Sequence, residues 1–595
     1  MAIKLPSSVL FEALRRHDKA STAIVDSASG EIITYASLLQ DVSSLKHQLL
    51  QELDQDDISG ERVAFIVENG YNYVVTLLSI LACNAIAVPL ALSFPASEHR
   101  HVINLSQASI LLASDKSLQK AREVIAEGLD VIPGLHSVNE MLSRSRENDI
   151  PYPDVLYTAD AGIMLFTSGT TAKPKGVMLS DATLSAQAQS LMEAWDYTSS
   201  DHLLHVLPLH HIHGIVNAVL TPLLSGSCIE IVYPFDADAV WRRLSVPFLE
   251  NQDINNDKEK SLSARKMPPI TFFTAVPTIW SRMLETYPSL SPEIQAAGKE
   301  AISRKHLRLN ISGSAALPKP IRDGWTELSG GNVLLERYGM TEVGMALSCG
   351  LDDNDRIDGS VGWPLRSVEA RLVETNAAGV QQVIEHGEEL DVVTGKERQG
   401  EIHLRGPTVF DGYWRDPVTT AKEFTQDGWF KTGDIATRRH VNGSGQGTSG
   451  SWATGPAYFV QGRQSADIIK TGGEKVSALE IEREILALPE VREVAVLGLP
   501  SQMWGQKVVA VVVLSEGTDS KPSWELADLR KSLRNRLVGY KIPQDLVVVQ
   551  TIKRNAMGKI NKKELALAVF GDAEKIRRRS VIVREERKLL RQSVA

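Results

Sequence analysis

The sequence predicts an α/β protein with a large, multi-layered N-terminal domain followed by a small, mobile α+β C-terminal domain. Residues 1–160 alternate helix-like and strand-like segments, and the pattern changes over residues 468–570, where one helix precedes two strands. Such alternation is typical of layered sheets covered by helices. A chain of 595 residues also has room for several compact units. We expect domains at residues 1–464 and 465–570, followed by a basic tail at 571–595.

The first elements in chain order support the layered domain. We expect a helix over Phe11–Arg16, a strand over Val63–Val67, a helix over Tyr71–Leu81, and strands over Ala85–Leu90 and Ile110–Ala113. Residues 74–92 carry no charge over a length that could cross a membrane. However, Asn84 and Pro89 divide this stretch, so a buried helix–turn–strand unit is favoured and no membrane span is expected.

Composition narrows the class of protein. A formal net charge of −9 offers no global polycationic surface, so nucleic acid is not expected as a partner. Three cysteines among apolar neighbours favour a reducing compartment over a disulfide framework. We expect a monomer or weak homo-oligomer in the cytoplasm. Two arginines near the N-terminus leave a mitochondrial address open, although Glu12 and Asp18 argue against it.

The stretch LFTSGTTAKPKGVMLS, at residues 165–180, carries the strongest chemical signal. A strand-like apolar run leads into a loop of hydroxyls, glycines and lysines: Thr167, Ser168, Gly169, Thr170, Thr171, Lys173 and Lys175. Small residues let backbone N–H groups approach a polyanion, and the lysines offset its charge. The spacing does not fit the P-loop, because Pro174 follows Gly169 where the second glycine would stand. The loop therefore predicts a nucleoside triphosphate bound by a loop other than the P-loop.

This stretch closely resembles the signature loop of the acyl- and aryl-adenylating enzymes, which include acyl-CoA synthetases, luciferases and adenylation domains of peptide synthetases. In that family the loop closes over the β- and γ-phosphates of ATP. One departure is Ala172, where the family usually has glycine. The resemblance implies ATP, Mg²⁺ and a carboxylic acid as ligands.

Histidines follow the next strand in HVLPLHHIHG, at residues 205–214. A metal site is one interpretation, but the spacing is weak evidence for it. The resemblance implies instead that His211 borders the acyl pocket, with His213 as a further donor. Strands are expected at Ile229–Val232, Ile270–Ala275 and Leu307–Asn310, and the polar stretch Asn251–Lys266 reads as a surface insertion.

Two later segments extend the resemblance. Their implied nucleotide contacts are Gly313, Ser314 and Ala315 in SGSAALP, and Glu336, Arg337, Tyr338, Gly339 and Met340 in LLERYGMTE. Tyr338 would stack on adenine, and Thr341 would contact the α-phosphate. Glu342 would hold Mg²⁺, for which a carboxylate is a suitable hard ligand. Asp434 and Arg463 would bind the ribose hydroxyls.

The C-terminal region supplies the remaining implied parts. A hinge lies at Gln464–Asp467, and Gly472, Gly473, Glu474 and Lys475 match the loop that lines the coenzyme A tunnel in acyl-CoA synthetases. Lys559, in RNAMGKI, matches the catalytic lysine. The Gly/Ser-rich stretch His440–Pro456 reads as a mobile loop without chemistry. We expect helices over Ala478–Leu488 and Trp524–Leu537, with strands over Val494–Leu499 and Val508–Leu514.

Taken together, the motifs imply a two-step acid:CoA ligase, and their combination looks most like malonyl-CoA synthetases. The implied acid-binding residues are His211, His213, Arg282, Ser314 and Met340, with Arg282 suited to a second carboxylate. Two alternatives stay open: a short- or medium-chain monocarboxylate:CoA ligase, and an adenylating loader for a carrier protein. A non-catalytic adenylate-binding protein is disfavoured because Lys559, Glu342 and Asp434 are all present.

Overall fold

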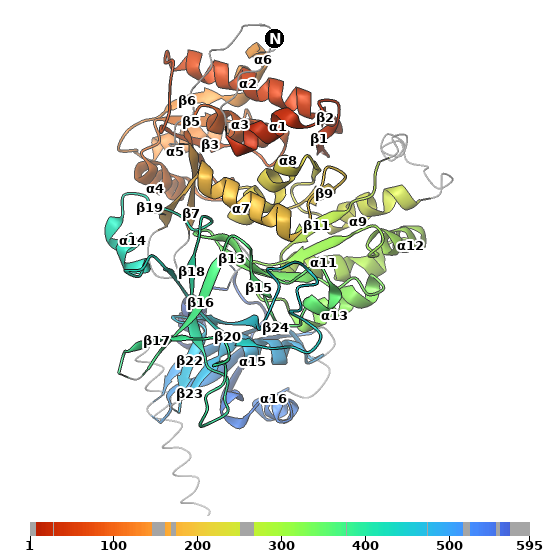
Figure 1. Ribbon diagram of the computed structural model, residues 1–595, viewed down its shortest axis with the longest axis vertical. Helices are drawn as coiled ribbons and strands as arrows, with labels where there is room; N and C mark the ends of the chain where they lie inside the picture. Colours follow the sequence, from red (N-terminus) through yellow and green to blue (C-terminus); the bar gives the residue numbers. More distant parts are fainter. Residues whose placement is uncertain are drawn as a thin grey trace, which may run out of the picture.

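The computed structural model contains four β-sheets, with the amino-terminal helices at one end of its long axis and the C-terminal elements at the other (Figure 1). The structure describes residues 8–27, 29–145, 161–167, 174–249, 267–376, 378–472, 474–501, 503–515, 524–554 and 560–571. The predicted α/β class is confirmed, with a large N-terminal part and a small C-terminal part.

A seven-stranded sheet has the order β19-β8-β7-β4-β3-β5-β6. Its strands are β3 Arg62–Ile66, β4 Ile86–Pro89, β5 Ile110–Ala113, β6 Gly134–Ser137, β7 Gly162–Thr167, β8 Lys175–Ser180 and β19 Gly412–Tyr413. Among these strands, β8 runs antiparallel to both of its neighbours, β7 and β19, and the other pairings are parallel. Every residue of β4 and β5 is buried, as expected for parallel strands covered on both faces. The predicted strands at these two positions are confirmed.

A nine-stranded sheet has the order β15-β14-β13-β12-β11-β9-β10-β1-β2. Its strands are β1 Thr22–Asp26, β2 Glu31–Thr34, β9 His202–His205, β10 Cys228–Ile231, β11 Phe272–Ala275, β12 Leu309–Ser312, β13 Leu335–Met340, β14 Gly344–Ser348 and β15 Trp363–Pro364. The run from β13 to β1 is parallel. The segments that follow β9, β11, β12 and β13 therefore leave the sheet at one edge, where ligands of open α/β sheets bind.

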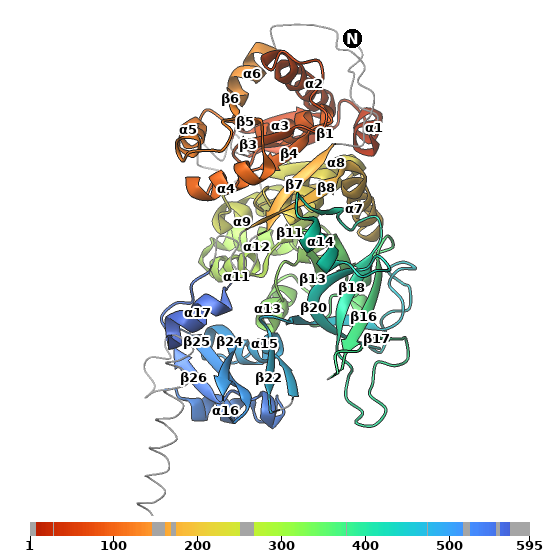
Figure 2. The ribbon, with the colours of Figure 1, turned by 90° about the vertical axis from the view of Figure 1, so that its left-hand side faces the viewer.

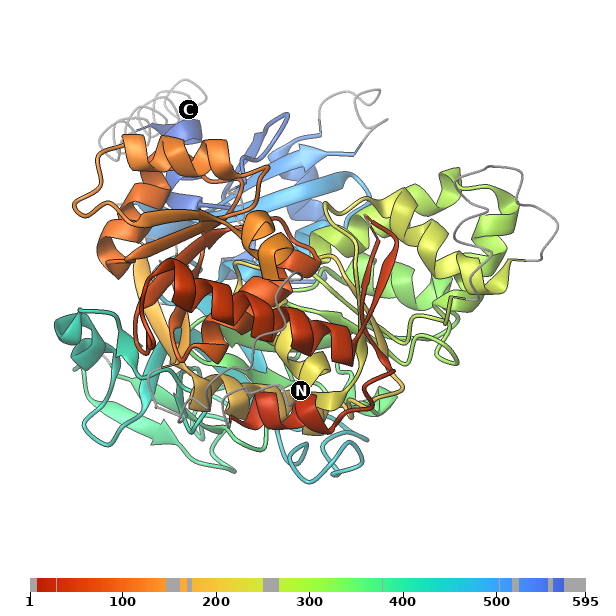
Figure 3. The ribbon, with the colours of Figure 1, turned by 90° about the horizontal axis from the view of Figure 1, so that it is seen from above.

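Several helices of these two sheets begin at side-chain caps. The backbone N–H of Phe11 donates to Ser8 Oγ at 3.3 Å, and Thr34 and Ser180 cap α2 and α7 in the same way. Seen from above in Figure 3, the red amino-terminal helices lie across the molecule, and α2 packs against α3 and α6. The bounds are α1 Val9–Arg16, α2 Tyr35–Glu52, α3 Tyr71–Ala82, α4 Ala96–Ser106, α5 Leu118–Ala126, α6 Val138–Ser145, α7 Asp181–Ala194, α8 Thr221–Ser225, α9 Ala237–Ser245, α11 Pro277–Thr286, α12 Pro292–Ala301 and α13 Lys319–Leu328.

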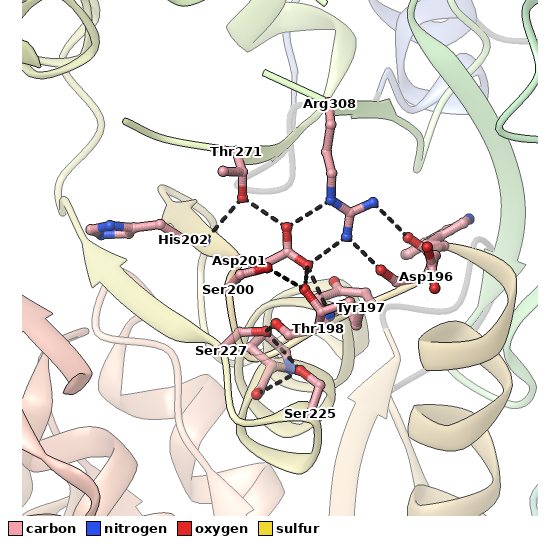
Figure 4. Close-up of polar contacts among 12 residues, drawn as sticks. Asp196, Tyr197, Thr198, Ser200, Asp201, His202, Ser225, Ser227, Thr271 and Arg308 are labelled. Atoms are coloured by element: carbon pink, nitrogen blue, oxygen red, sulfur yellow. Dashed lines mark hydrogen bonds and ion pairs between the residues drawn. The ribbon is translucent and has the colours of Figure 1, made fainter. Parts of the chain in front are cut away.

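An ion pair between the buried Asp201 and the half-buried Arg308 lies at the opposite, amino-terminal edge of the nine-stranded sheet (Figure 4). Asp201 precedes β9, Thr271 precedes β11 and Arg308 precedes β12. Arg308 Nε and Nη2 donate to the two carboxylate oxygens of Asp201 at 2.7 and 2.6 Å, and Thr271 Oγ1 donates to Asp201 Oδ1 at 2.8 Å. The carboxylate thus ties three strand starts together by charge-assisted hydrogen bonds.

A five-stranded sheet, β17-β16-β18-β20-β21, connects the large sheets to the C-terminal part. Its elements are β16 Glu369–Thr375, β17 Gln381–Ile384, β18 Gly400–Arg405, β20 Phe430–Arg439, β21 Ala457–Arg463 and the helix α14 Pro417–Glu423. We expected a mobile loop at residues 440–456, but this stretch is held by contacts to the rest of the protein. Ser449 Oγ donates to Asp355 Oδ2 at 2.6 Å, and Ala453 packs in a small core with Trp363 and Phe459.

The C-terminal part contains the remaining sheet, in the order β23-β22-β25-β24 with β26 beside β25. Figure 2 shows these strands together with α15, α16 and α17, below the large sheets. The bounds are β22 Ile468–Thr471, β23 Glu474–Ser477, β24 Val491–Ser501, β25 Gly505–Leu514, β26 Asp545–Val548, α15 Ala478–Leu486, α16 Leu526–Leu533 and α17 Lys562–Phe570. The predicted helices and strands are confirmed within a few residues. Because β21 ends at Arg463 and β22 begins at Ile468, the chain changes sheet at the predicted hinge, whereas the domain limits stay a prediction.

The cysteines and the uncharged stretch at residues 74–92 lie in the positions that the sequence indicates. Cys83 and Cys349 are buried, Cys228 is half-buried, and all three are free thiols. Residues 74–92 form most of α3 and all of β4, as the interrupted apolar pattern indicates. Within the described ranges, none of the helices combines the length and the apolar character that a membrane crossing requires.

Candidate active site

Thr167 and Lys175, at the two ends of the predicted phosphate loop, lie at the end of a β-hairpin. Strands β7 and β8 are antiparallel, and their register ends with Thr167 opposite Lys175. Lys175 Nζ lies 4.3 Å from the centroid of the Tyr413 ring. The predicted contacts Ser168, Gly169, Thr170, Thr171 and Lys173 lie outside the described residues. Lys175, at one end of the loop, thus faces the ring of Tyr413.

Three of the predicted nucleotide-binding residues meet at one carboxylate. Tyr338 Oη donates to Asp434 Oδ2 at 2.6 Å, and Arg463 Nε donates to Asp434 Oδ1 at 3.1 Å. Asp434 and Tyr338 are buried, and they come from β20 and β13, which belong to different sheets. Burial, and then the negative charge of Asp434, raise the pKa of Tyr338 well above its ordinary value. A carboxylate has lone pairs beyond these two bonds, so Asp434 can still accept from a ribose.

Glu342 is the second buried carboxylate of this region. Tyr413 Oη donates to Glu342 Oε1 at 3.0 Å, and the backbone N–H of Phe410 donates to the Glu342 carbonyl at 2.8 Å. Burial raises the pKa of Glu342 above its ordinary value, although the Tyr413 hydrogen bond opposes this. Thr341 is half-buried beside it. The sequence motifs did not single out Tyr413, which lies in the tripeptide GYW at residues 412–414.

The donor set around Glu342 fits Mg²⁺ only together with ligand oxygens. Over the described ranges, no three His, Cys, Asp or Glu side chains group in a way that would hold a metal ion by themselves. Proteins nevertheless often supply only one or two carboxylate ligands to Mg²⁺, and phosphate oxygens and water supply the others.

Several predicted acid-binding residues lie at the carboxyl edge of the nine-stranded sheet. His213 Nε2 is 2.7 Å from Thr274 Oγ1 on β11, and His213 Nδ1 is 3.3 Å from Ser314 Oγ after β12. Burial, followed by the charge of Arg337, lowers the pKa of His213 well below its ordinary value, so this imidazole is neutral. His213 opens the π-helix His213–Leu220, and the ring of His211 packs against the ring of His210 with centroids 4.0 Å apart.

The other residues that were predicted to contact the acid or the adenine differ in their exposure to solvent. Arg282 is exposed on α11, while Met340 ends β13 and is half-buried. Gly313 is buried, and Ala315 is exposed in the turn after β12. Gly339 lies where an added Cβ would come within 2.1 Å of the Gly344 carbonyl oxygen, so the β13–β14 hairpin requires glycine there.

Glu336 on β13 links the site to the C-terminal part. Burial raises the pKa of Glu336 to about 7; the guanidinium of Arg483 lowers it and the carboxylate of Asp358 raises it. Arg483 lies on α15 and forms an ion pair with Asp358. Sequence reasoning did not identify this contact, because the two residues are far apart in the chain and neither lies in a chemical motif.

The described residues of the predicted coenzyme A loop lie where β22 ends and β23 begins in the C-terminal sheet. Gly472 has φ of +59°, in the left-handed region that favours glycine. Glu474 forms an ion pair with Lys396 at 3.0 Å, and Lys475 is exposed. Gly473 and the predicted catalytic Lys559 lie outside the described residues, as do the insertion at 250–266 and the tail at 572–595.

Comparisons with known proteins agree with this arrangement. The family model described as AMP-binding enzyme matches residues 10–414, and the model described as AMP-binding enzyme C-terminal domain matches residues 480–559. A protein named CoA ligase from Gibberella moniliformis is 62% identical over 597 residues, which cover 99% of each chain.

More distant relatives carry a substrate in their names. The human protein named malonate–CoA ligase, mitochondrial, is 39% identical over 86% of this chain and 83% of its own length. Among solved structures, ATP-bound MatB from Rhodopseudomonas palustris has a TM-score of 0.75 and 27% identity, covering 95% of this chain and 99% of that one.

Proposed function

The chain belongs to the AMP-binding enzyme family and is an ATP-dependent CoA ligase, and from this premise we propose that its acid substrate is malonate. Two comparisons support malonate: the human relative and an Arabidopsis thaliana malonate–CoA ligase at 36% identity. The observation that carries the ligase chemistry is the meeting of Tyr338 and Arg463 at Asp434, beside Glu342.

The reaction would proceed in two displacements. A carboxylate oxygen of the acid attacks the α-phosphorus of ATP, an acyl–phosphate bond forms, and pyrophosphate leaves. The coenzyme A thiol then loses its proton, its sulfur attacks the acyl carbon, and AMP leaves. A free carboxylate is a poor acyl donor because its leaving group is poor, and adenylation replaces it with a good one.

Different residues of this chain would bind the phosphates, the ribose, Mg²⁺ and coenzyme A. Thr167 and Lys175 would bind phosphates at the hairpin tip, and Asp434 would accept hydrogen bonds from the ribose. Glu342 would bind Mg²⁺, which supplies charge neutralisation at the phosphates. Lys559 would stabilise the charge that develops during adenylation. Gly472, Glu474 and Lys475 would border the path of coenzyme A after the small domain turns about residues 464–467.

The names of the relatives also concern the cellular compartment of the protein. Several of them carry the word mitochondrial in their names, whereas the composition of this chain favours the cytoplasm. A cytoplasmic location stays our proposal, and fractionation with an antibody against the protein would test it.

The substrate proposal is tested by product identity. Purified protein is incubated with MgATP and acetate, malonate, methylmalonate or octanoate, with and without coenzyme A, while pyrophosphate is measured. We expect malonate to give the fastest pyrophosphate release and malonyl-CoA as the thioester. Preference for acetate or octanoate would support a monocarboxylate ligase. Pyrophosphate without a thioester would support a loader for carrier proteins.

A further inference from the structure

The carboxylate of Asp434 lies on an irregular stretch of β20. Between β18 and β20, Glu401 lies opposite Ile435, whereas His403 lies opposite Lys431. More residues of β20 than of β18 lie between these two pairs, so β20 contains a β-bulge that includes Asp434. Bulges redirect a side chain at one point of a strand, and this bulge therefore sets where the Asp434 carboxylate points.

Gly433, the residue before Asp434, gives the bulge its backbone shape. It has φ of +73°, in the left-handed region that favours glycine. Its N–H donates to Oε1 of Glu401 at 2.9 Å, and its carbonyl accepts the N–H of Gln464 at 2.9 Å. Gln464 directly follows Arg463, so Gly433 joins the two stretches that carry the predicted ribose contacts.

Thr432 supplies the other side-chain contacts of the bulge. Its Oγ1 donates to the carbonyl of Ile402 at 2.8 Å and accepts the N–H of Asp434 at 3.1 Å. These contacts involve the bulge itself and the backbone of β18. Glu401, in contrast, reaches the bulge with a charged side chain from the neighbouring strand.

Glu401 is a mostly buried carboxylate. Its side chain is 17% exposed, and Nε2 of His403 lies 3.7 Å from its Oε2. Burial raises the pKa of Glu401, but His403 and the hydrogen bond from Gly433 outweigh it, and the pKa lies below its ordinary value. The group is therefore ionised at neutral pH, and an ionised carboxylate is a stronger acceptor for an N–H than a neutral oxygen.

The hydrogen bond from Gly433 to Glu401 fixes the bulge more than it fixes the sheet. Paired residues join β18 to β20 on both sides of the bulge, so the two strands stay together without this bond. The bond instead holds the N–H that precedes Asp434 by one residue. Its loss would let the bulge turn, and a small displacement of a binding group is enough to weaken binding.

We propose that Glu401 is a positioning residue for ATP, which holds Gly433 so that the Asp434 carboxylate meets the ribose hydroxyls. This inference rests on the ribose-binding role of Asp434 in the proposed function. Glu401 acts through Asp434, so a change at Glu401 should weaken the binding of nucleotides that have ribose hydroxyls. Nucleotides without these hydroxyls should be affected much less.

Two variants of Glu401 separate its reach from its charge. Glu401→Asp keeps the charge beside His403 but is one methylene too short to reach the Gly433 N–H. Glu401→Gln keeps an oxygen at the original reach and loses the charge. The matched control is Glu369→Gln, on the adjacent strand β16 in an exposed pair with Arg405.

Each protein is compared with MgATP and with Mg-2′,3′-dideoxy-ATP, using the acid that the natural protein converts fastest. For the natural protein we expect KM to be at least about tenfold lower for ATP than for the dideoxy analogue. In Glu401→Asp, KM for ATP should rise about 5- to 20-fold, while kcat and KM for the analogue change less than about threefold. Glu401→Gln and Glu369→Gln should keep the preference for ATP within about threefold of the natural protein.

A second measurement needs no acid and no turnover. The rise in melting temperature on adding MgATP should be smaller in Glu401→Asp than in Glu401→Gln, and the rise with the dideoxy analogue should be equal in both. If Glu401→Asp weakens both nucleotides in parallel, or if Glu401→Gln loses the preference as fully as Glu401→Asp, the inference is wrong. If the natural protein does not distinguish the two nucleotides, the ribose-binding role of Asp434 fails first, and the inference fails with it.

Discussion

The hydrogen bond from Tyr413 lowers the pKa of Glu342, the predicted Mg²⁺ ligand. Glu342 must be ionised to bind Mg²⁺, yet burial raises its pKa. The phenol of Tyr413 donates to Glu342 Oε1 at 3.0 Å and favours the ionised form. Tyr413→Phe should therefore raise this pKa further and move the acid limb of kcat/KM for MgATP upward by about 0.5–1 pH unit.

The control for this prediction is Tyr458→Phe. Tyr458 is also buried, and its hydroxyl donates to the Ala370 carbonyl at 3.3 Å, but it has no contact with Glu342. The two pH profiles are compared with that of the natural protein. An acid limb that moves equally in both variants would mean that Tyr413 acts through general stability.

At the same scale, the residues that sequence could identify are those in local motifs. Tyr338, Asp434 and Arg463 were each named from a motif, and the structure brings them together. The burial of Arg337 could not be read from the sequence, because it depends on Gly313 and Ser314 from another strand end. Long-range contacts such as Arg483 with Asp358 are missed for the same reason.

Among the elements, the Asp201–Arg308 ion pair joins the starts of β9 and β12 (Figure 4). Burial raises the pKa of Asp201, but hydrogen bonding and charge from Arg308 outweigh it, and the pKa lies below its ordinary value. Because the folded-state pKa is depressed, the pair stabilises the fold above the ordinary pKa of aspartate. That contribution is lost as the pH falls through the lower, folded-state pKa.

Asp201→Asn should thus destabilise the large domain by about 2–4 kcal/mol near pH 7, since Arg308 loses its charged partner. The apparent melting temperature should fall by several degrees throughout the range from about pH 5 to 8, and by less only below about pH 4, where the folded-state Asp201 carboxylate takes up its proton. Asp238→Asn, in an exposed pair with Arg242 at 2.7 Å, is the matched control and should change little. A deficit that is the same at every pH would contradict the assignment to this carboxylate.

The elements themselves were largely predictable, with one instructive failure. Fully buried strands such as β4 and β5 read as apolar runs, so their positions followed from composition. The stretch at 440–456 reads as a mobile loop because glycine and serine dominate it. Its anchors are Asp355 and Trp363, which lie roughly eighty to a hundred residues earlier, so no local pattern could reveal them.

At the scale of the whole molecule, the two-step reaction requires the small domain to serve each step in turn. Lys559 matches the adenylation lysine, so Lys559→Ala should lower acyl-AMP formation from acid and ATP by about 100-fold or more. Thioester formation from supplied acyl-AMP should be largely retained. Lys563→Ala, an exposed lysine on α17, is the control and should support both steps. Equal losses in both steps would show that Lys559 does not act in adenylation alone.

The central claim is that this CoA ligase prefers malonate to acids with one carboxylate. The most direct test places malonate and propionate at equal concentration in one reaction with limiting coenzyme A, and measures both thioesters by mass spectrometry. The product ratio equals the ratio of kcat/KM values. We predict malonyl-CoA in excess by at least about 30-fold, the value of one charge-assisted contact. Propionyl-CoA in equal or greater amount would contradict the account.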